Sequence, residues 1–484
     1  MSPAVAVLIV AIVQTVAGLG LLAVLGFGST ARELLRYAAV APLAGMAWMG
    51  VLAATLATLG SRLSVAGMVL VTVATCAGGA LRVVRRPDEP AARPVQRRRS
   101  LVDNLVVAAS LLPLGVVTLF AVALFRIKPL AEYDGWAMWG MKSRAIAALG
   151  AADPALFASQ AYARLHLEYP LLLPSLHALP LQLLDDFSSN AVVLDCFVLG
   201  LAGLAAVWGV LRDLVRPSIL LPFLAALATA PAFFGQLATG YADVPLAMFV
   251  AAGVVASARW LLDDARRWLV LTTLFVAAAT LTKNEGLLFG VATYVALLVA
   301  AEGRRRAVLV SGAVVALVYA PWRAYVAIHD LGAPDYDLSS SFNLPWVVRR
   351  LDRAPEAAEG LLRRATEQYQ FGFLLALGAV AVVVALLVGP RRLGILGGAF
   401  GLLSFAGLTW IYVLTPADVS DYLSSNGDRV IVSLVVGLTA LAPLLLEETT
   451  RRLATRTDPA TVTTAPGGSS SPSATLPAAS PGAP

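Results

Sequence analysis

Ionisable side chains recur where the long apolar segments of this sequence end. The groups are Glu132 with Asp134, Lys142 with Arg144, His166–Glu168–Tyr169, Tyr241–Asp243, Lys283–Asn284–Glu285 and Asp428–Arg429. Ionisable groups at the edge of a bilayer are costly and usually functional. Carboxylates beside cations suit a reaction in which a general base takes a proton from a hydroxyl while Lys and Arg stabilise an anionic leaving group such as a phosphate. We therefore expect a polar, charge-paired site built from several helix ends.

Other chemistries lack their motifs. The sequence has no Gly-x-x-x-x-Gly-Lys-Ser/Thr loop for ATP, no His-Glu-x-x-His zinc motif and no Gly-x-Ser-x-Gly hydrolase elbow. Cys76 and Cys196 both lie inside apolar segments. We expect them to be small buried residues without a disulfide or a metal.

A divalent metal stays an open question. Carboxylate oxygens and imidazole nitrogens are suitable ligands for such ions. The candidate ligands are Glu132, Asp134, His166, Glu168 and Asp243. Histidines in an external loop are more often ordinary surface or hydrogen-bonding residues, so no metal is assigned.

The composition places these residues in a membrane protein. Hydrophobic residues make up 58% of the 484 residues and charged residues only 14%, against about 25% charged residues in soluble domains. We predict an all-α, polytopic protein with about thirteen spans. The predicted spans are 3–26, 37–59, 65–81, 103–124, 190–211, 218–238, 243–262, 268–282, 286–301, 307–326, 371–389, 393–414 and 430–446.

Charge fixes the predicted orientation. Seven arginines lie between residues 82 and 99, and basic loops stay in the cytoplasm. Alternating the spans from this connector places the other arginine-rich loops inside and the candidate site on the outer face. The net charge of +6 therefore reflects topology, and we predict a lipid bilayer and no nucleic acid as a partner. The predicted localisation is the cell membrane.

The domain organisation follows from these segments. The predicted parts are a three-span N-terminal module at 1–84, a basic cytoplasmic connector at 85–102, a transmembrane catalytic module at 103–446 with external loops 125–189 and 327–370, and a disordered cytoplasmic tail at 447–484. The segment 165–187 is apolar but contains three prolines, which indicates an interfacial or re-entrant piece.

The stretch after Asp134 has helical spacing. We expect Trp136, Trp139 and Ile146 to lie along the membrane interface, with Lys142 and Arg144 facing water or lipid phosphate. Asp134 could act as a base, or it could only cap this helix, since Asp is a favoured N-cap residue.

The order of these motifs resembles the GT-C superfamily of membrane glycosyltransferases. Asp134 precedes "WAMWGMKSRAI", and "HLEYPLLLPSL", "TGYADVPLA" and "LTKNEGLL" follow in turn. The pattern is similar to the protein O-mannosyltransferase and aminoarabinose-transferase branch, which is glycosyltransferase family 39-like, and covers roughly residues 103–446. The three N-terminal spans lie outside it, and the large soluble C-terminal domain of many relatives is missing.

The resemblance implies an inverting transfer of sugar from a polyprenyl-phosphate donor to an envelope glycan, lipid or protein at the outer face. It implies catalytic carboxylates at Asp134 and Asp243, with Glu132 resembling the acidic pair of some members. Lys283 and Arg429 match basic positions near the donor phosphate, and Lys142 is a further candidate there. The predicted substrate-binding residues are Trp136, His166, Glu168, Tyr169, Tyr241, Asn284, Glu285 and Asp428.

Two other classes stay open at this point. A transporter or lipid flippase would also carry ionisable residues, although transporters tend to show repeats and charges near the bilayer midplane. A non-catalytic scaffold would not need so many charges at span ends.

Overall fold

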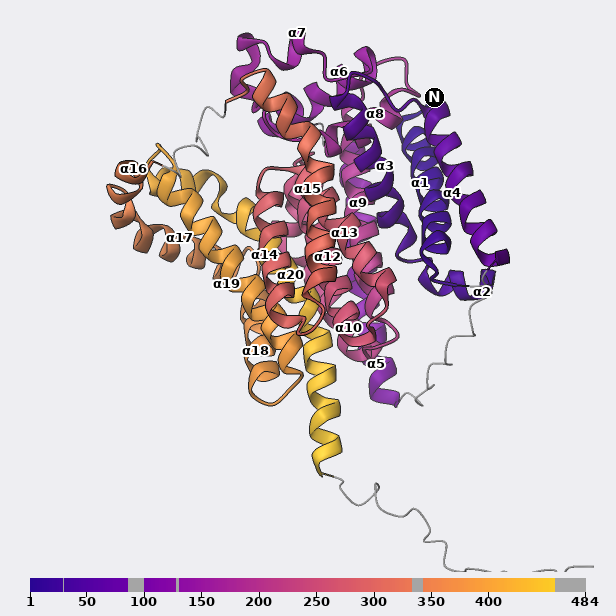
Figure 1. Cartoon of the computed structure of the whole chain (residues 1–484), viewed down its shortest axis with the longest axis vertical. Helices are drawn as coiled ribbons and strands as arrows, with labels where there is room; N and C mark the ends of the chain where they lie inside the picture. The colour runs from indigo at the N-terminus through magenta and orange to yellow at the C-terminus, as the bar shows by residue number, and fades with distance from the viewer. Residues whose placement is uncertain (29, 86–99, 128–129, 333–342, 458–484) are drawn as a thin grey trace, which may run out of the picture.

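The computed structural model describes residues 1–28, 30–85, 100–127, 130–332 and 343–457 (Figure 1). Within these ranges every regular element is a helix, which confirms the predicted all-α membrane fold. The greater part of the basic connector, the centre of the external loop 327–370 and the tail from residue 458 lie outside the described residues.

The N-terminal spans pack directly on the rest of the protein. They are α1 (Pro3–Leu25), α3 (Ala41–Thr58) and α4 (Val65–Arg85), with α2 (Ala31–Leu34) and η1 (Leu35–Tyr37) between the first two. A Cβ atom on Gly18 would lie 1.9 Å from the Ala41 carbonyl oxygen, and one on Gly45 would lie 1.8 Å from the Gln14 carbonyl oxygen. The glycines thus let α1 and α3 touch through their backbones, as small residues do between membrane helices. The other side of α3 packs on α8, α9 and α13.

The rest of the bundle consists of α12 (Asp243–Asp263) and ten further helices among the described residues. They are α5 (Leu101–Ile127), α9 (Ser189–Leu211), α10 (Pro217–Thr229), α11 (Pro231–Leu237), α13 (Arg266–Thr282), α14 (Glu285–Ala300), α15 (Arg305–Ile328), α18 (Leu374–Leu387), α19 (Arg391–Leu414) and α20 (Val419–Thr457). Helix α12 is enclosed by protein on all sides and packs on α9, α13 and α20. Its first residue, Asp243, lies where α12 meets the end of α13 and the first turns of α20.

The predicted count of thirteen spans is not confirmed. Nine helices among the described residues are long and apolar enough to cross a membrane, or ten if α10 and α11, bent by 61°, form one broken span. The other three predicted spans are helical but short, because α13, α14 and α18 contain 17, 16 and 14 residues. About 20 residues are needed to cross the apolar core.

The last helix is longer than predicted. Helix α20 begins at Val419 and ends at Thr457, so its first turns extend beyond the predicted span 430–446 on one side and its last turns on the other. The prediction of a disordered tail from residue 447 is therefore wrong as far as Thr457.

Short elements lie at one end of the bundle and at its side. The first external loop forms η2 (Asp134–Gly140), α6 (Met141–Leu149), α7 (Pro154–Phe157), η3 (Gln160–Leu165) and α8 (Leu172–Leu181). The second loop forms α16 (Leu344–Val348), η5 (Leu351–Arg353) and α17 (Ala354–Thr366). All ten residues of α8 are buried, so the proline-containing segment is an integral part of the protein core. Figure 1 shows α6 and α7 at the upper end and α16–α17 projecting to the side.

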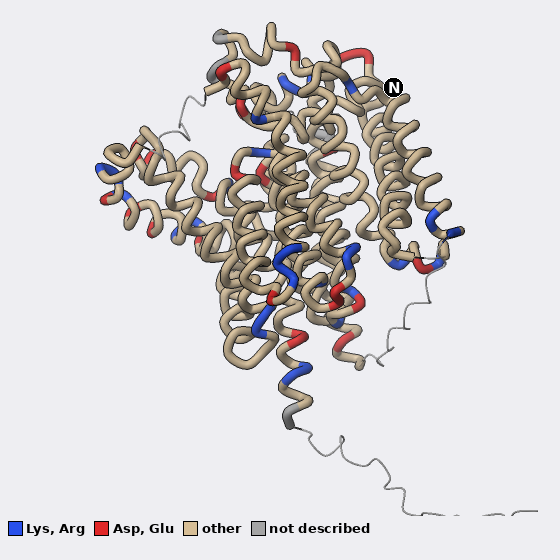
Figure 2. The backbone as a smooth tube through the Cα atoms, in the orientation of Figure 1, with Lys and Arg blue, Asp and Glu red and all other residues tan. Residues whose placement is uncertain are grey.

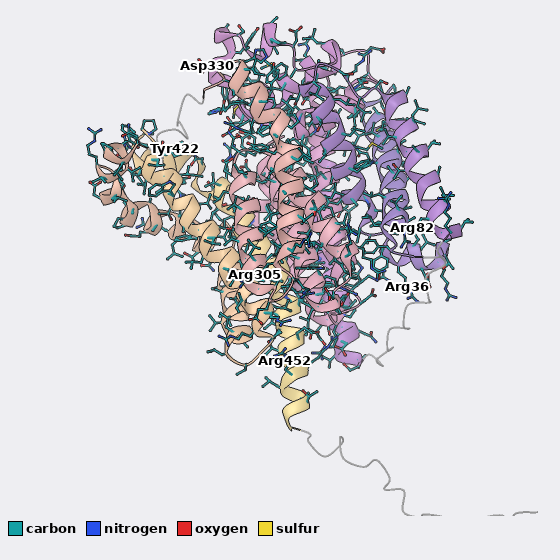
Figure 3. All side chains as sticks on the ribbon, viewed as in Figure 1. Arg36, Arg82, Arg305, Asp330, Tyr422 and Arg452 are labelled. Atoms are coloured by element: carbon teal, nitrogen blue, oxygen red, sulfur yellow. The ribbon has the colours of Figure 1, made fainter. Side chains whose placement is uncertain are left out.

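Basic residues gather toward the opposite end. Figure 2 shows Lys and Arg at the lower helix ends, with others on the side-projecting α16–α17 segment and near the upper end. Figure 3 places Arg36, Arg82, Arg305 and Arg452 below Asp330. The arginines labelled in Figure 3 thus lie toward the end opposite α6 and α7, whereas further arginines lie in the segment from α16 to α17. Which end faces the cytoplasm stays a prediction.

Candidate active site

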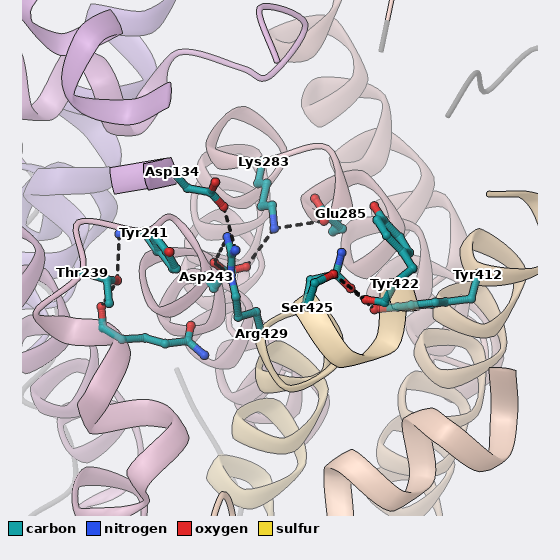
Figure 4. Close-up of polar contacts among 12 residues, drawn as sticks. Asp134, Thr239, Tyr241, Asp243, Lys283, Glu285, Tyr412, Tyr422, Ser425 and Arg429 are labelled. Atoms are coloured by element: carbon teal, nitrogen blue, oxygen red, sulfur yellow. Dashed lines mark hydrogen bonds and ion pairs between the residues drawn. The ribbon is translucent and has the colours of Figure 1, made fainter. Parts of the chain in front are cut away.

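Three carboxylates and two cations form a continuous ion-pair network (Figure 4). Arg429 Nη1 lies 2.6 Å from Asp134 Oδ2, and Arg429 Nη2 lies 3.3 Å from Asp243 Oδ2. Lys283 Nζ lies 2.8 Å from Asp243 Oδ1 and 3.0 Å from Glu285 Oε1. Arg429 thus bridges the two predicted catalytic carboxylates, and Asp243 bridges the two predicted phosphate-binding cations.

The network depends on where helices begin and end. Asp243 is the first residue of α12, and Lys283 follows the last residue of α13, two positions before α14 begins at Glu285. A Cβ atom on Gly286 would lie 1.9 Å from the Ala279 carbonyl oxygen. Only glycine therefore lets α14 start so close to α13, which keeps Lys283 beside Asp243.

Burial divides the network into an inner and an outer part. Asp243 is 2% exposed and Lys283 5% exposed, whereas the side chains of Asp134 and Arg429 are 20% and 18% exposed. Burial alone would lower the pKa of Lys283, but the Asp243 and Glu285 carboxylates outweigh it and raise that pKa above its usual range. Lys283 is therefore a permanent cation, and Asp134 stands at the accessible end.

The Asp134 side chain does not cap a helix. Asp134 is the first residue of a π-helical segment that lacks a side-chain cap hydrogen bond, and its carboxylate instead pairs with Arg429. π-Helical turns are rare and occur frequently at functional sites. Gly135 brings this turn close to the 239–241 loop, since a Cβ atom there would lie 2.0 Å from the Thr239 carbonyl oxygen.

Tyr241 supports the bridging arginine. The Arg429 guanidinium lies 4.0 Å from the centroid of the Tyr241 ring, an arrangement that stabilises the cation. Burial raises the pKa of the Tyr241 hydroxyl, Arg429 opposes this, and Asp134 and Glu132 raise the pKa further. The hydroxyl therefore stays protonated at neutral pH and can donate a hydrogen bond.

The histidine-containing piece forms a second, buried cluster. His166 Nδ1 lies 3.0 Å from Glu168 Oε1, and the Tyr169 ring stacks on His166 and on Trp139 with centroid distances of 4.9 and 5.6 Å. Lys283 Nζ lies 5.9 Å from the Tyr169 ring centroid. Tyr169 therefore joins this cluster to the ion-pair network.

Lys142 does not face water or lipid, in contrast to the prediction. It is fully buried and donates a hydrogen bond of 2.5 Å from Nζ to the His166 carbonyl oxygen. Its ammonium lies 5.6 and 5.7 Å from the ring centroids of Trp139 and Tyr169. Trp139 and Ile146 are buried as well. Helix α6 can turn Lys142 inward together with its apolar residues. The Trp139 and Tyr169 rings and the His166 carbonyl oxygen provide the ammonium with partners in place of water.

Other predicted residues lie at the edge of the network or beside it. Trp136 is exposed and contacts Tyr133 edge to face. Glu132, Asn284 and Asp428 are partly exposed neighbours of Asp134, Lys283 and Arg429 in the chain. Within the described part of the chain, no group of three His, Cys, Asp or Glu side chains could hold a metal ion.

Sequence reasoning missed two polar groups. Tyr422, Asn426 and Arg429 lie on one face of α20, and the Tyr412 hydroxyl donates to Asn426 Oδ1 over 2.5 Å. Their i, i+4, i+7 spacing could have indicated this face. His177 Nδ1 lies 2.8 Å from Asp195 Oδ2 and its Nε2 lies 3.5 Å from Cys196 Sγ. All three side chains are buried, so this group links α8 to α9 inside the protein.

The fold and the network agree with a membrane glycosyltransferase as the class of protein. Residues 168–325 match the model of the family described as dolichyl-phosphate-mannose-protein mannosyltransferase. Over this segment the chain is similar to that family, which confirms the predicted resemblance. The comparisons with curated proteins and with solved structures found no match. The matched segment contributes Asp243 and Lys283, whereas Asp134 and Arg429 come from outside it.

Proposed function

We propose that this protein transfers a sugar from a polyprenyl-phosphate donor to an acceptor hydroxyl at the extracytoplasmic face of the membrane. The observation that carries the proposal is the convergence of Asp134, Asp243, Lys283 and Arg429 from different elements into one network. The family match within 168–325 supports the reaction class. A sugar bound through a lipid phosphate would reach the network from the bilayer.

Lys283 and Arg429 have the charge that the leaving group requires. When the acceptor oxygen attacks the anomeric carbon, the bond from that carbon to the phosphate oxygen breaks and its electron pair stays on the phosphate. Cations at a water-poor site stabilise the developing charge. Attack from the face opposite the phosphate inverts the anomeric carbon.

Asp134 is the better candidate for the base. Asp243 contacts both cations and is 2% exposed, so its carboxylate is committed to holding them. Asp134 contacts Arg429 through one oxygen, and its side chain is 20% exposed. In this proposal Asp134 takes the acceptor proton, and Asp243 positions Lys283 and Arg429 for the phosphate.

The extracytoplasmic placement rests on charge. Apart from those in the α16–α17 segment, arginines of the connecting loops gather at the end of the bundle opposite α6 and α7 (Figure 2), and basic loops are retained in the cytoplasm. The network forms beside η2, which immediately precedes α6 in the chain, so the proposed topology opens it to the outer face.

The Asp134→Asn variant tests the proposal. Asn has the same shape but cannot accept the proton, so release of polyprenyl phosphate from polyprenyl-phosphate mannose should fall at least about a hundredfold. Mannose is the first sugar to test because the matched family is named for it. The assay uses native membranes that contain the acceptor, and donor binding to purified protein should persist.

Asp330→Asn provides a matched control. Asp330 is exposed and has φ of +50°, a conformation that Asn tolerates, so this variant should keep wild-type turnover. Near-normal turnover in Asp134→Asn would show that the base lies elsewhere.

A further inference from the structure

Two buried acceptor oxygens beside the network lack hydrogen-bond partners. Glu285 is 9% exposed, and its Oε1 accepts from Lys283. Glu285 Oε2 and the neighbouring Asn284 Oδ1 have no hydrogen-bond partner among the described residues. A buried polar atom without a partner costs roughly 1–3 kcal/mol, and native proteins contain few of them. These two oxygens are therefore available to accept hydrogen bonds from a bound molecule.

Polar and aromatic side chains surround this point. In Figure 4, Glu285 lies between Lys283 and Tyr422, with Tyr412 and Ser425 nearby. The rings of Tyr412 and Tyr422 lie 5.2 Å apart. Asn284 and Tyr422 are partly exposed and Ser425 is exposed, so the group opens to the surface on one side. We call Asn284, Glu285, Tyr422 and Asn426 the α14–α20 cluster.

The two halves of the site differ in hydrogen-bonding chemistry. Lys and Arg carry only donors and match an ionised phosphate, which offers acceptors. A carboxylate oxygen and an amide oxygen are acceptors, and they match hydroxyl groups, which donate. A sugar phosphate carries an acceptor-rich phosphate next to a donor-rich set of hydroxyl groups. The phosphate would face Lys283 and Arg429, and the hydroxyl groups would face Glu285 and Asn284.

We propose that the α14–α20 cluster is the subsite for the donor sugar, with Glu285 and Asn284 accepting hydrogen bonds from its hydroxyl groups and the Tyr422 ring packing on its apolar face. The inference rests on the proposed function and goes further by separating phosphate recognition from sugar recognition. The ligand class is a neutral, hydroxyl-rich sugar. Glu285 and Asn284 are then specificity-determining residues.

Binding of paired probes to the purified full-length protein in nanodiscs tests this subsite. The probes are a polyprenyl phosphate without sugar and the same lipid carrying mannose, glucose, galactose or arabinose. The wild type should bind at least one sugar-loaded probe about tenfold more tightly than the bare phosphate, as expected from one or two hydrogen bonds.

Glu285→Gln replaces one carboxylate oxygen by a donor while leaving an acceptor for Lys283. We expect this variant and Asn284→Ala to lose most of the preference for the sugar and to bind the bare phosphate like the wild type. Ser424→Ala is the control, because Ser424 is exposed and its hydroxyl donates to the Asp421 carbonyl of the same helix. It should retain the preference.

The outcomes separate the subsite from the proposed function. Retention of the sugar preference in Glu285→Gln and Asn284→Ala, or no preference in the wild type, would overturn the subsite while the proposed reaction stands. If the wild type binds none of the polyprenyl phosphates, the proposed function itself fails.

Discussion

At the residue scale, Arg429 and Asp243 pair with each other, and each also pairs with one further residue of opposite charge. Each contacts two groups of opposite charge, so the removal of one would leave another buried charge unpaired. Such a loss costs several kcal/mol. Neutral variants of the same shape are therefore better probes of chemistry here than alanine variants.

Lys142 makes stability depend on pH. Burial lowers the pKa of its ammonium to about 7, with Glu168 opposing the shift, against about 10.4 in an unfolded chain. Between these values the unfolded chain holds a proton that the folded protein lacks. The contribution of Lys142 to the free energy of unfolding therefore rises as the pH increases from about 7 to 10. This contribution is lost as the pH falls through the same window.

We expect Lys142→Met to remove this dependence. The apparent melting temperature of the wild type, relative to the variant, should rise between pH 7 and pH 9.5 in detergent. Arg144→Met, which changes an exposed cation on the same helix, should follow the wild type. Parallel pH profiles for wild type and Lys142→Met would contradict a buried, titrating ammonium.

At the element scale, the first turns of α20 are held from both sides. One face carries Tyr422, Asn426 and Arg429 toward the site. On the other face, Leu423 packs closely on Gly360 of α17. A Cβ atom on Gly360 would lie 2.2 Å from Leu423 Cδ1. Helix α17 therefore supports the turns of α20 that carry Arg429, although none of the ion pairs described above involves a residue of α17.

Arg353 fixes the loop that precedes α20. Its Nη1 and Nη2 donate to the carbonyl oxygens of Thr415 and Ala417 over 2.8 and 2.7 Å, and Arg350 also donates to Thr415. These bonds join the external helices to the α19–α20 loop.

Arg353→Ala should therefore weaken binding of polyprenyl phosphate about tenfold by loosening the position of Arg429, since hydrogen bonds from a charged group contribute roughly 1.5–3 kcal/mol. Arg363→Ala removes only an exposed pair with Glu359, worth at most about 1 kcal/mol, and should bind normally. The measurement is lipid binding to both purified variants. Equal affinities would assign Arg353 no role in positioning the site.

At the scale of the whole molecule, the separation of charges predicts the topology. Glu302 precedes the arginines 304–306, and Glu359 lies on α17. A membrane-impermeant maleimide should label Glu359→Cys on intact cells and Glu302→Cys only in inverted vesicles, with the wild type as background. The reverse labelling would move the site to the cytoplasmic face and exclude the proposed extracytoplasmic transfer.

The sequence by itself determined the class of fold and identified residues of the candidate site. Apolar segments and the polar residues at their ends are local properties, because the bilayer imposes length and charge on each segment separately. Asp134, Asp243, Lys283 and Arg429 were for this reason identifiable one by one.

The tertiary structure alone decided which of these residues meet. The contact of Asp134 with Arg429, the inward orientation of Lys142 and the α14–α20 cluster each depend on how helices far apart in the chain pack. Backbone contacts at Gly135 and Gly286 and the contact of Gly360 with the Leu423 side chain contribute to that packing. Small residues allow helices to pack closely, but their positions in the sequence do not identify the neighbouring helix. An ionisable residue at the end of a predicted span thus indicates a candidate site residue. The residue with which it pairs depends on which helix packs beside it.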